Sequence, residues 1–173
     1  MEPWEDTNGI WKSKASFFSW LRGHLRKAWT RYPIKNSFLK SNRFRASIGK
    51  QGREVWACKC ERCEKTFPQS KIQVDHITPA GKLNDWKDVE SFAKRLFTTT
   101  NELRILCKGC HEIITYAYIY DMDEADVPNQ LKIIAFSQLK ADKQKERLKS
   151  LRIEPASNNK ERTKQYETHI KTQ

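Results

Sequence analysis

The chain has 173 residues, of which 38% are apolar and 31% charged, and its formal net charge is +12. This length suits one globular domain with a sizeable core and extensions rather than two typical domains. No run approaches the roughly 20 apolar residues of a membrane-spanning helix, and the first residues lack the layout of a signal peptide. We therefore expect a cytoplasmic protein without a membrane partner.

The positive charge is concentrated near the N-terminus. All 12 charged residues between positions 7 and 53 are Lys or Arg, which leaves 33 − 12 = 21 bases against 21 acids elsewhere. Such a segment is typical of a polyanion-binding surface, because each neutralised phosphate releases condensed counterions. We predict nucleic acid as the partner; a solvated basic surface or attraction to acidic lipid are the alternatives.

The first element predicted from the sequence is a helix. Phe18, Leu21, Leu25 and Trp29 recur at the period of a helix and predict one over residues 15–29. The polar, basic stretch 37–53 that follows contains glycines and is typical of a mobile connector. We therefore assign residues 1–53 to a basic helical extension with a boundary near Arg53.

The central segment, 54–120, alternates strand and helix signals. Ile72 and Val74 alternate with polar neighbours and predict a strand over 71–76, which Pro79 and Gly81 end. Apolar spacing then predicts a helix over 84–97, a strand over 103–106 and a helix over 110–120. The fold class expected from this order is α+β.

The last third of the chain is predicted to be helical and then disordered. Residues 121–126 are acidic and suit the first turn of a helix, where carboxylates complement the helix dipole. Apolar spacing extends this helical extension to about Arg152, so that it covers 121–154. Residues 155–173 have almost no apolar content, which is typical of a disordered tail.

Two CxxC pairs predict a metal site. Cys60 and Cys63 form the first, and Cys107 and Cys110 the second, each able to present two thiolates from a tight turn to one zinc ion. Four thiolates complete a tetrahedral shell, so the zinc would be structural. Cys58 offers a second spacing, but the two-residue gap at Cys60 matches the other pair; coincidental buried cysteines or a redox pair are the alternatives.

Any catalysis must then come from other residues. Asp75 and His76 are adjacent at a predicted strand end and so point to opposite faces. Asp75 offers a hard oxygen ligand to Mg²⁺, and His76 is a residue of the type that most often acts as a general base near neutral pH. His111 directly follows the last zinc cysteine and opens the apolar helix. The alternatives are a plain strand end for the first two and a helix cap for His111.

These motifs stand in a familiar order: Cys60-x2-Cys63, Val74-Asp75-His76-Ile77-x-Pro79 and Asn101-x-Leu103-x3-Cys107-x2-Cys110-His111. The order, over about 50 residues, resembles HNH endonucleases of the zinc-containing ββα-metal (His-Me finger) class. The resemblance implies a ββα-metal core braced by a four-cysteine zinc site, with helical extensions on either side.

The resemblance also implies roles. His76 would be the general base, Asp75 and His111 would hold one catalytic Mg²⁺ or Mn²⁺ ion, and Asn101 would stabilise the loop that orients the base. The enzyme would hydrolyse DNA and leave 5′-phosphate and 3′-hydroxyl ends. After His111 the family often has a polar or basic residue, whereas this chain has Ile113 and Ile114, which puts a helper residue there in doubt.

The basic segment 16–45 resembles, less specifically, the extension of small HNH proteins of tailed phages. The resemblance implies an infected bacterial host, phage packaging or replication proteins as further partners, and DNA contacts from Arg22, Arg26, Lys27, Arg31, Arg43 and Arg45. Trp20, Trp29 and Tyr32 are predicted to be core residues. Cutting both strands would favour a homodimer or two successive nicks. A non-catalytic zinc-ribbon nucleic-acid-binding protein is the main rival, and a thiol redox protein comes third.

Overall fold

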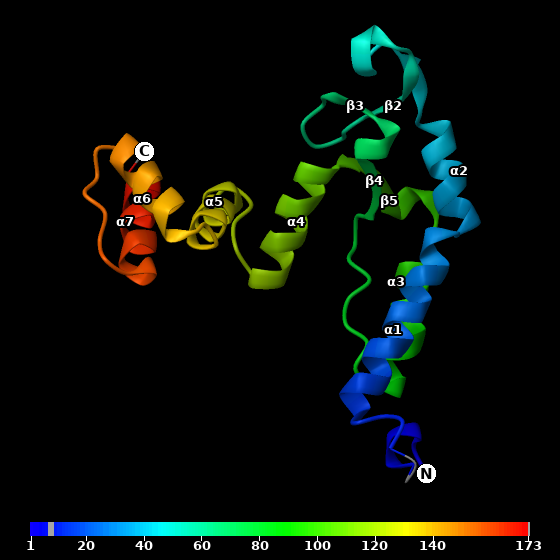
Figure 1. The fold of residues 1–173 in the computed structure, drawn as a ribbon. Coiled ribbons are helices and arrows are strands. Elements are labelled where there is room, and N and C mark those ends of the chain that lie inside the picture. The colour runs from blue at the N-terminus through cyan, green and yellow to red at the C-terminus, as the bar shows by residue number, and fades with distance from the viewer. Residues whose placement is uncertain (7–8, 173) are drawn as a thin grey trace. The chain divides into compact units, whose positions relative to one another are not determined.

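The computed structural model describes residues 1–6 and 9–172. The fold is α+β, with helices and two small antiparallel sheets, as predicted (Figure 1). The chain divides into two compact units, Met1–His111 and Glu112–Gln173. The predicted boundary near Arg53 therefore falls inside the first unit, and the basic segment belongs to the same unit as the cysteine motifs.

The first unit is built on the helix α1 (Lys14–Thr30), which confirms the predicted helix. The Ser13 side chain caps it by accepting a hydrogen bond from the Ser16 amide, which satisfies a free donor of the first turn. Its buried residues Phe17 and Phe18 join a core with Phe92 and Leu96 of the helix α3 (Val89–Leu96). Its Lys and Arg residues are left on the other faces.

The stretch 37–53 is ordered structure, so its prediction as a mobile connector is wrong. The helix α2 (Pro33–Ser41) begins at a proline, whose fixed φ suits a first turn. A three-stranded antiparallel sheet follows, in which β1 (Phe44–Ala46), β2 (Val55–Lys59) and β3 (Thr66–Pro68) pair in sequence order. Gly49 is required in the β1–β2 connection, because a Cβ there would lie 2.5 Å from the Arg53 carbonyl oxygen.

The second sheet is a two-stranded pair that runs into a helix. β4 (Ile72–His76) pairs antiparallel with β5 (Leu103–Cys107), so that Asp75 lies opposite Arg104. β5 leads directly into the helix α4 (Lys108–Tyr120). Between the strands lie the one-turn helix η4 (Trp86–Asp88), α3 and the turn η5 (Thr100–Glu102). The predicted strands and helices of this segment are thus confirmed with small shifts of their ends.

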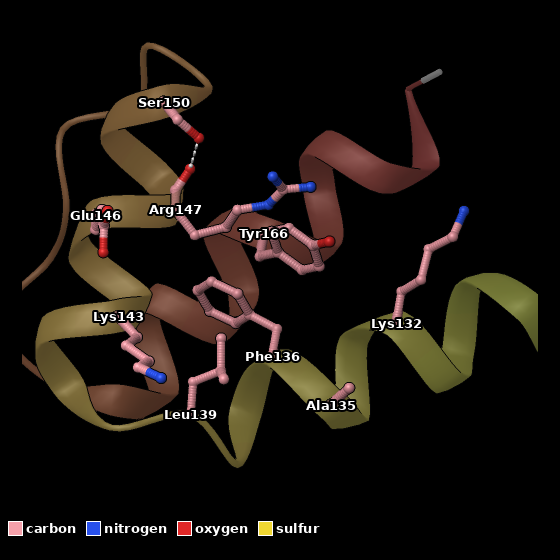
Figure 2. A pocket seen from close by; sticks show the side chains of 9 residues that line it. All are labelled: Lys132, Ala135, Phe136, Leu139, Lys143, Glu146, Arg147, Ser150 and Tyr166. Carbon is pink, nitrogen blue, oxygen red and sulfur yellow. Dashed lines mark hydrogen bonds between the residues drawn. The ribbon is translucent and has the colours of Figure 1, made fainter.

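After the end of α4 at Tyr120, the second unit continues with the helices α5 (Val127–Ser137), α6 (Ala141–Ser150) and α7 (Asn159–Lys171). The prediction of a single helix reaching Arg152 is therefore wrong, because α5 ends at Ser137 and a separate helix, α6, begins at Ala141. The core of this unit is the parallel stack of the Phe136 and Tyr166 rings, whose centroids are 4.2 Å apart (Figure 2). Ile133 and Leu148 complete it.

The prediction of a disordered tail from residue 155 is also wrong, with Gln173 outside the described residues. Tyr166 of α7 is only 7% exposed, and Arg162 is 4% exposed although charged. Arg162 Nε donates to Gln144 Oε1 at 2.8 Å, and its Nη1 donates to the Ala156 and Ser157 carbonyl oxygens. The low apolar content of this segment suggested disorder. In the structure, the buried Tyr166 ring and the hydrogen bonds of Arg162 hold it in place instead. Within the described residues, no helix has the length and apolar character needed to cross a membrane.

Candidate metal centre and adjoining polar site

The two predicted CxxC pairs come together in the structure. The ligand atoms of Cys60, Cys63, Cys107 and Cys110 all lie within 4.8 Å of one another, and three of the four residues are buried. A tetrahedral site with sulfur ligands at about 2.3 Å places its sulfurs about 3.8 Å apart. These four cysteines are therefore close enough to hold a metal ion, and their donor set suits zinc.

Backbone hydrogen bonds shape the first cysteine turn and fix it to the second sheet. Glu64 N donates to Cys60 O at 2.8 Å, and Glu64 adopts a positive φ of 57° that lets the chain reverse. Glu61 spans the gap to β5, because its amide donates to Ile105 O at 2.9 Å and its Oε1 accepts from Ile105 N at 2.6 Å. Glu61 thereby holds the Cys60 turn beside the strand that ends at Cys107.

The surroundings affect the thiols unequally. Burial would raise the pKa of Cys60, but backbone hydrogen bonds from Cys63, Cys107 and Arg62 lower it to about 6. Burial and the neighbouring Cys107 thiol raise the pKa of Cys110 to about 12. Four adjacent thiolates repel one another, so a divalent cation is what would allow all four to be ionised together.

Cys58 lies outside the cluster. It is fully buried in β2 opposite Phe67, and burial raises the pKa of its thiol. The choice of Cys60 over Cys58 as the partner of Cys63 is therefore confirmed by the geometry.

Asp75 and His111 meet beside the cysteine cluster. Asp75 Oδ1 lies 3.4 Å from His111 Nε2, while its Oδ2 accepts a hydrogen bond from Arg104 Nε at 2.9 Å and forms an ion pair with Arg104 Nη2 at 2.8 Å. The two oxygens of this carboxylate thus have different partners. Arg104 fixes one of them, and the other faces the imidazole.

Hydrogen bonding keeps Asp75 ionised. Burial would raise the pKa of this carboxyl, but the hydrogen bonds from His111 and Arg104 and their positive charge outweigh it, and the pKa falls below its usual range. An ionised carboxylate next to an imidazole nitrogen is a donor pair that suits a divalent cation.

His76 points to the other face of β4, as its position next to Asp75 predicts. Its Nε2 lies 2.9 Å from the carbonyl oxygen of Leu96, at the end of α3. A carbonyl only accepts, so Nε2 carries the proton and Nδ1 of the neutral ring keeps its lone pair. The Trp29 ring from α1 lies against the imidazole at a centroid distance of 4.3 Å.

Asn101 lies exposed in η5. The loop after β4 is held instead by Glu102, whose carbonyl oxygen accepts from Ile77 N at 2.9 Å and whose carboxylate accepts from Thr78 Oγ1 at 3.2 Å. For Asn101 itself, no side-chain hydrogen bond is found in the described part of the chain. The structure therefore brings Asp75 and His111 together, places His76 on the opposite face at the end of β4, and gives the loop contacts to the residue beside Asn101.

Sequence reasoning missed Arg104, Glu61 and Glu102 and assigned Trp29 to the core alone. The sequence did contain a signal for Arg104, because pairing the two strands so that both CxxC pairs meet places Arg104 opposite Asp75.

The predicted DNA contacts lie in two groups. Arg22, Arg26 and Lys27 are on α1 and Arg31 is its C-cap, whereas Arg43 and Arg45 are at β1. The prediction of Trp20 as a core residue is wrong, since it is 44% exposed.

Comparison with protein-family models, curated proteins and solved structures finds no match for this chain. A surface pocket of about 590 Å³ lies in the second unit above the Phe136–Tyr166 stack (Figure 2). It contains none of the predicted site residues, so the functional inference depends on the geometry around β4 and β5.

Proposed function

We propose that this protein is a metal-dependent DNA endonuclease of the HNH type. In this proposal β4, β5 and α4 form a ββα-metal core, and the four cysteines hold a structural zinc ion. The observation that carries the proposal is the pairing of Asp75 Oδ1 with His111 Nε2 at 3.4 Å, next to a histidine whose Nδ1 is free to accept a proton.

His76 fits the role of general base in this arrangement. The Leu96 carbonyl oxygen holds the proton of Nε2, so the neutral ring presents the basic Nδ1. Trp29 covers the ring and limits its rotation. A histidine held in one tautomer can take a proton from the water that attacks a phosphodiester.

Asp75 and His111 fit the role of ligands to a divalent cation. Adjacent ligands of a six-coordinate ion with bonds of about 2.1 Å are about 3.0 Å apart, close to the 3.4 Å between these donor atoms. A divalent cation bound there would supply Lewis-acid stabilisation of the charge that develops on the phosphate oxygens. Arg104 holds the second carboxylate oxygen and so fixes the direction of the first.

One observation favours the rival function, a non-catalytic zinc-ribbon protein that binds nucleic acid. Arg104 and a protonated His111 together satisfy Asp75 as a structural ion-pair network, without a cation. In that case the exposed basic residues of α1 would be the whole functional surface. The nuclease proposal is preferred because it also accounts for the orientation of His76.

The direct test is cleavage of supercoiled plasmid by the wild type and His76→Ala, each with Mg²⁺, Mn²⁺ or no added metal. We expect metal-dependent cutting by the wild type and a loss of about 100- to 10,000-fold in His76→Ala, which is the usual contribution of a general base. The matched control is His24→Ala, which removes an exposed histidine of α1 whose Nδ1 lies 3.0 Å from the Trp20 carbonyl oxygen and whose ring lies against the Trp20 ring.

Zinc content and circular dichroism of each variant establish that it is folded. Equal cutting by the wild type and His76→Ala, or no cutting by the folded wild type with either metal, would exclude the nuclease function. DNA binding that persists without cutting would favour the zinc-ribbon alternative.

A further inference from the structure

An exposed tryptophan holds two arginines on the first sheet. The guanidinium carbon of Arg43 lies 4.1 Å from the centroid of the Trp56 ring, and that of Arg45 lies 4.7 Å from it. Arg45 is the cross-strand partner of Trp56 in the β1–β2 pair, and Arg43 lies two residues away, so all three side chains belong to one face. We name these three residues the Arg–Trp–Arg platform.

The platform is open to a partner. Trp56 is 40% exposed and the Arg45 side chain is 51% exposed. Arg43 Nη1 donates to Gln69 Oε1 at 3.4 Å, and Arg45 Nε lies 3.7 Å from Glu54 Oε2. The Glu54 contact joins two exposed groups and is therefore weak. Within the described residues, these contacts use few of the five N–H donors of each guanidinium group.

Stacking changes what these arginines can do. A guanidinium stacked on an aromatic face is fixed in orientation and keeps its planar row of donors free, which matches the two oxygens of a phosphate. Less rotational freedom is then lost when a phosphate binds. A free lysine offers the same charge without this preorganisation.

We propose that the Arg–Trp–Arg platform is a preorganised clamp for the phosphate backbone of DNA, separate from the point of cleavage. This inference rests on the proposed function for the identity of the polyanion. Gln69, the partner of Arg43, begins the turn Gln69–Lys71 that precedes β4, whose far end carries Asp75 and His76. Six residue steps span at most about 20 Å, the length of about six nucleotides of one strand. Gln69 thus lies within about six nucleotides of Asp75, so a clamp at its partner Arg43 can hold the same duplex as the proposed catalytic residues.

The test measures binding and not cleavage. A fluorescein-labelled 30-base-pair duplex is titrated with the full chain carrying His76→Ala, and anisotropy gives Kd at several salt concentrations. Adding Arg43→Lys with Arg45→Lys keeps both charges but removes the stacked planar donors. We expect Kd to rise about tenfold, and the salt dependence of Kd to stay unchanged because both charges are kept.

Three further variants separate charge from preorganisation. Arg43→Ala with Arg45→Ala should weaken binding more and reduce the slope of log K against log salt by about 1.8, or about 0.9 for each lost phosphate contact. Trp56→Ala should resemble the lysine pair, and Trp56→Phe should restore most of the affinity because it keeps an aromatic face. Zinc content and circular dichroism exclude unfolding of any variant.

The matched control is Arg147→Lys with Arg152→Lys, the same chemical change at exposed arginines of the second unit, for which we expect Kd to change by less than about twofold.

Unchanged Kd in the Arg43/Arg45 lysine pair and in Trp56→Ala would overturn the clamp while leaving the nuclease proposal intact. If the platform variants weaken binding as expected but the wild type does not cut DNA, the clamp would stand and the nuclease proposal would be overturned. Phosphatidylserine vesicles form a second arm, and tighter platform-dependent binding to them than to DNA would overturn the clamp.

Discussion

Arg104 holds one oxygen of Asp75 and leaves the other directed at His111. Both side chains of this ion pair are mostly buried, with 23% and 16% exposure. Arg104→Ala should therefore lower the free energy of unfolding at pH 7 by about 1–3 kcal/mol, because it leaves a mostly buried carboxylate without its permanently charged partner. Urea unfolding of the wild type and the variant measures this, and Arg53→Ala, an exposed arginine, is the control.

The same pair makes a prediction about pH. The pKa of Asp75 is lowered in the folded chain, so its contribution to stability is fully present above the unfolded pKa near 4 and is lost as the pH falls through the folded pKa. The difference in stability between wild type and Arg104→Ala should therefore shrink as the pH is lowered from 6 toward 3. A difference that stays constant or grows over this range would contradict the ion-pair account.

Cys58 and Cys63 allow a matched test of the metal site, because only Cys63 belongs to the cluster. Cys63→Ser should abolish the binding of about one zinc ion per chain and unfold the first unit, since the free energy of binding a structural zinc ion is coupled to folding. Cys58→Ala should retain the metal and cost about 1–2 kcal/mol through the small cavity it leaves. Zinc analysis and thermal unfolding compare the two. A folded Cys63→Ser protein without zinc would contradict the prediction.

At the scale of single residues, the spacing of the cysteines predicted the four that could hold a metal ion. The chemical type of Asp75, His76 and His111 marked them as candidate site residues. The sequence did not predict which residues contact them. The contact of Trp29 with His76 joins residues 47 positions apart in the sequence, and the bond from His76 to the Leu96 carbonyl oxygen depends on where α3 ends. Both depend on tertiary packing, which no local pattern records.

The helix α7 is an element whose stability depends on one aromatic residue. Tyr166 stacks on Phe136 and is 7% exposed. Tyr166→Ala should destabilise the second unit by about 3–5 kcal/mol, the usual cost of removing a buried aromatic ring. Lys164→Ala, on an exposed position of the same helix, should change stability by less than about 0.5 kcal/mol. Hydrogen exchange of the α7 amides measures both, and equal protection in the two variants would show that the stack does not hold the helix.

Elements with a clear apolar period were predicted well, and elements held by polar groups were not. Phe18, Leu21 and Leu25 mark α1 in the sequence as clearly as in the structure. The helix α7 was missed because its contacts come from Tyr166 and the buried pair of Arg162 and Gln144. β1 was missed because three residues are too short a window for alternation to be recognised.

On the scale of the whole molecule, the six tryptophans report on one unit only. All lie between Trp4 and Trp86, within Met1–His111. Removal of zinc by a strong chelator should therefore shift tryptophan emission to the red as the first unit loosens, while amides in residues 127–171 stay protected from hydrogen exchange. Loss of protection in both parts at the same chelator concentration would show that the two units fold as one. Lys164→Ala protein serves as the metal-binding control.

The position of Trp29 has a practical consequence for shortening the chain. A fragment that begins at residue 54 would retain every cysteine, Asp75, His76 and His111, and would contain the whole of the sequence motif. It would nevertheless lack the indole that covers His76 and the Tyr32 hydroxyl that donates to the Phe97 carbonyl oxygen. Such a minimal protein would leave the imidazole free to reorient, so the working unit starts well upstream of its recognisable signature.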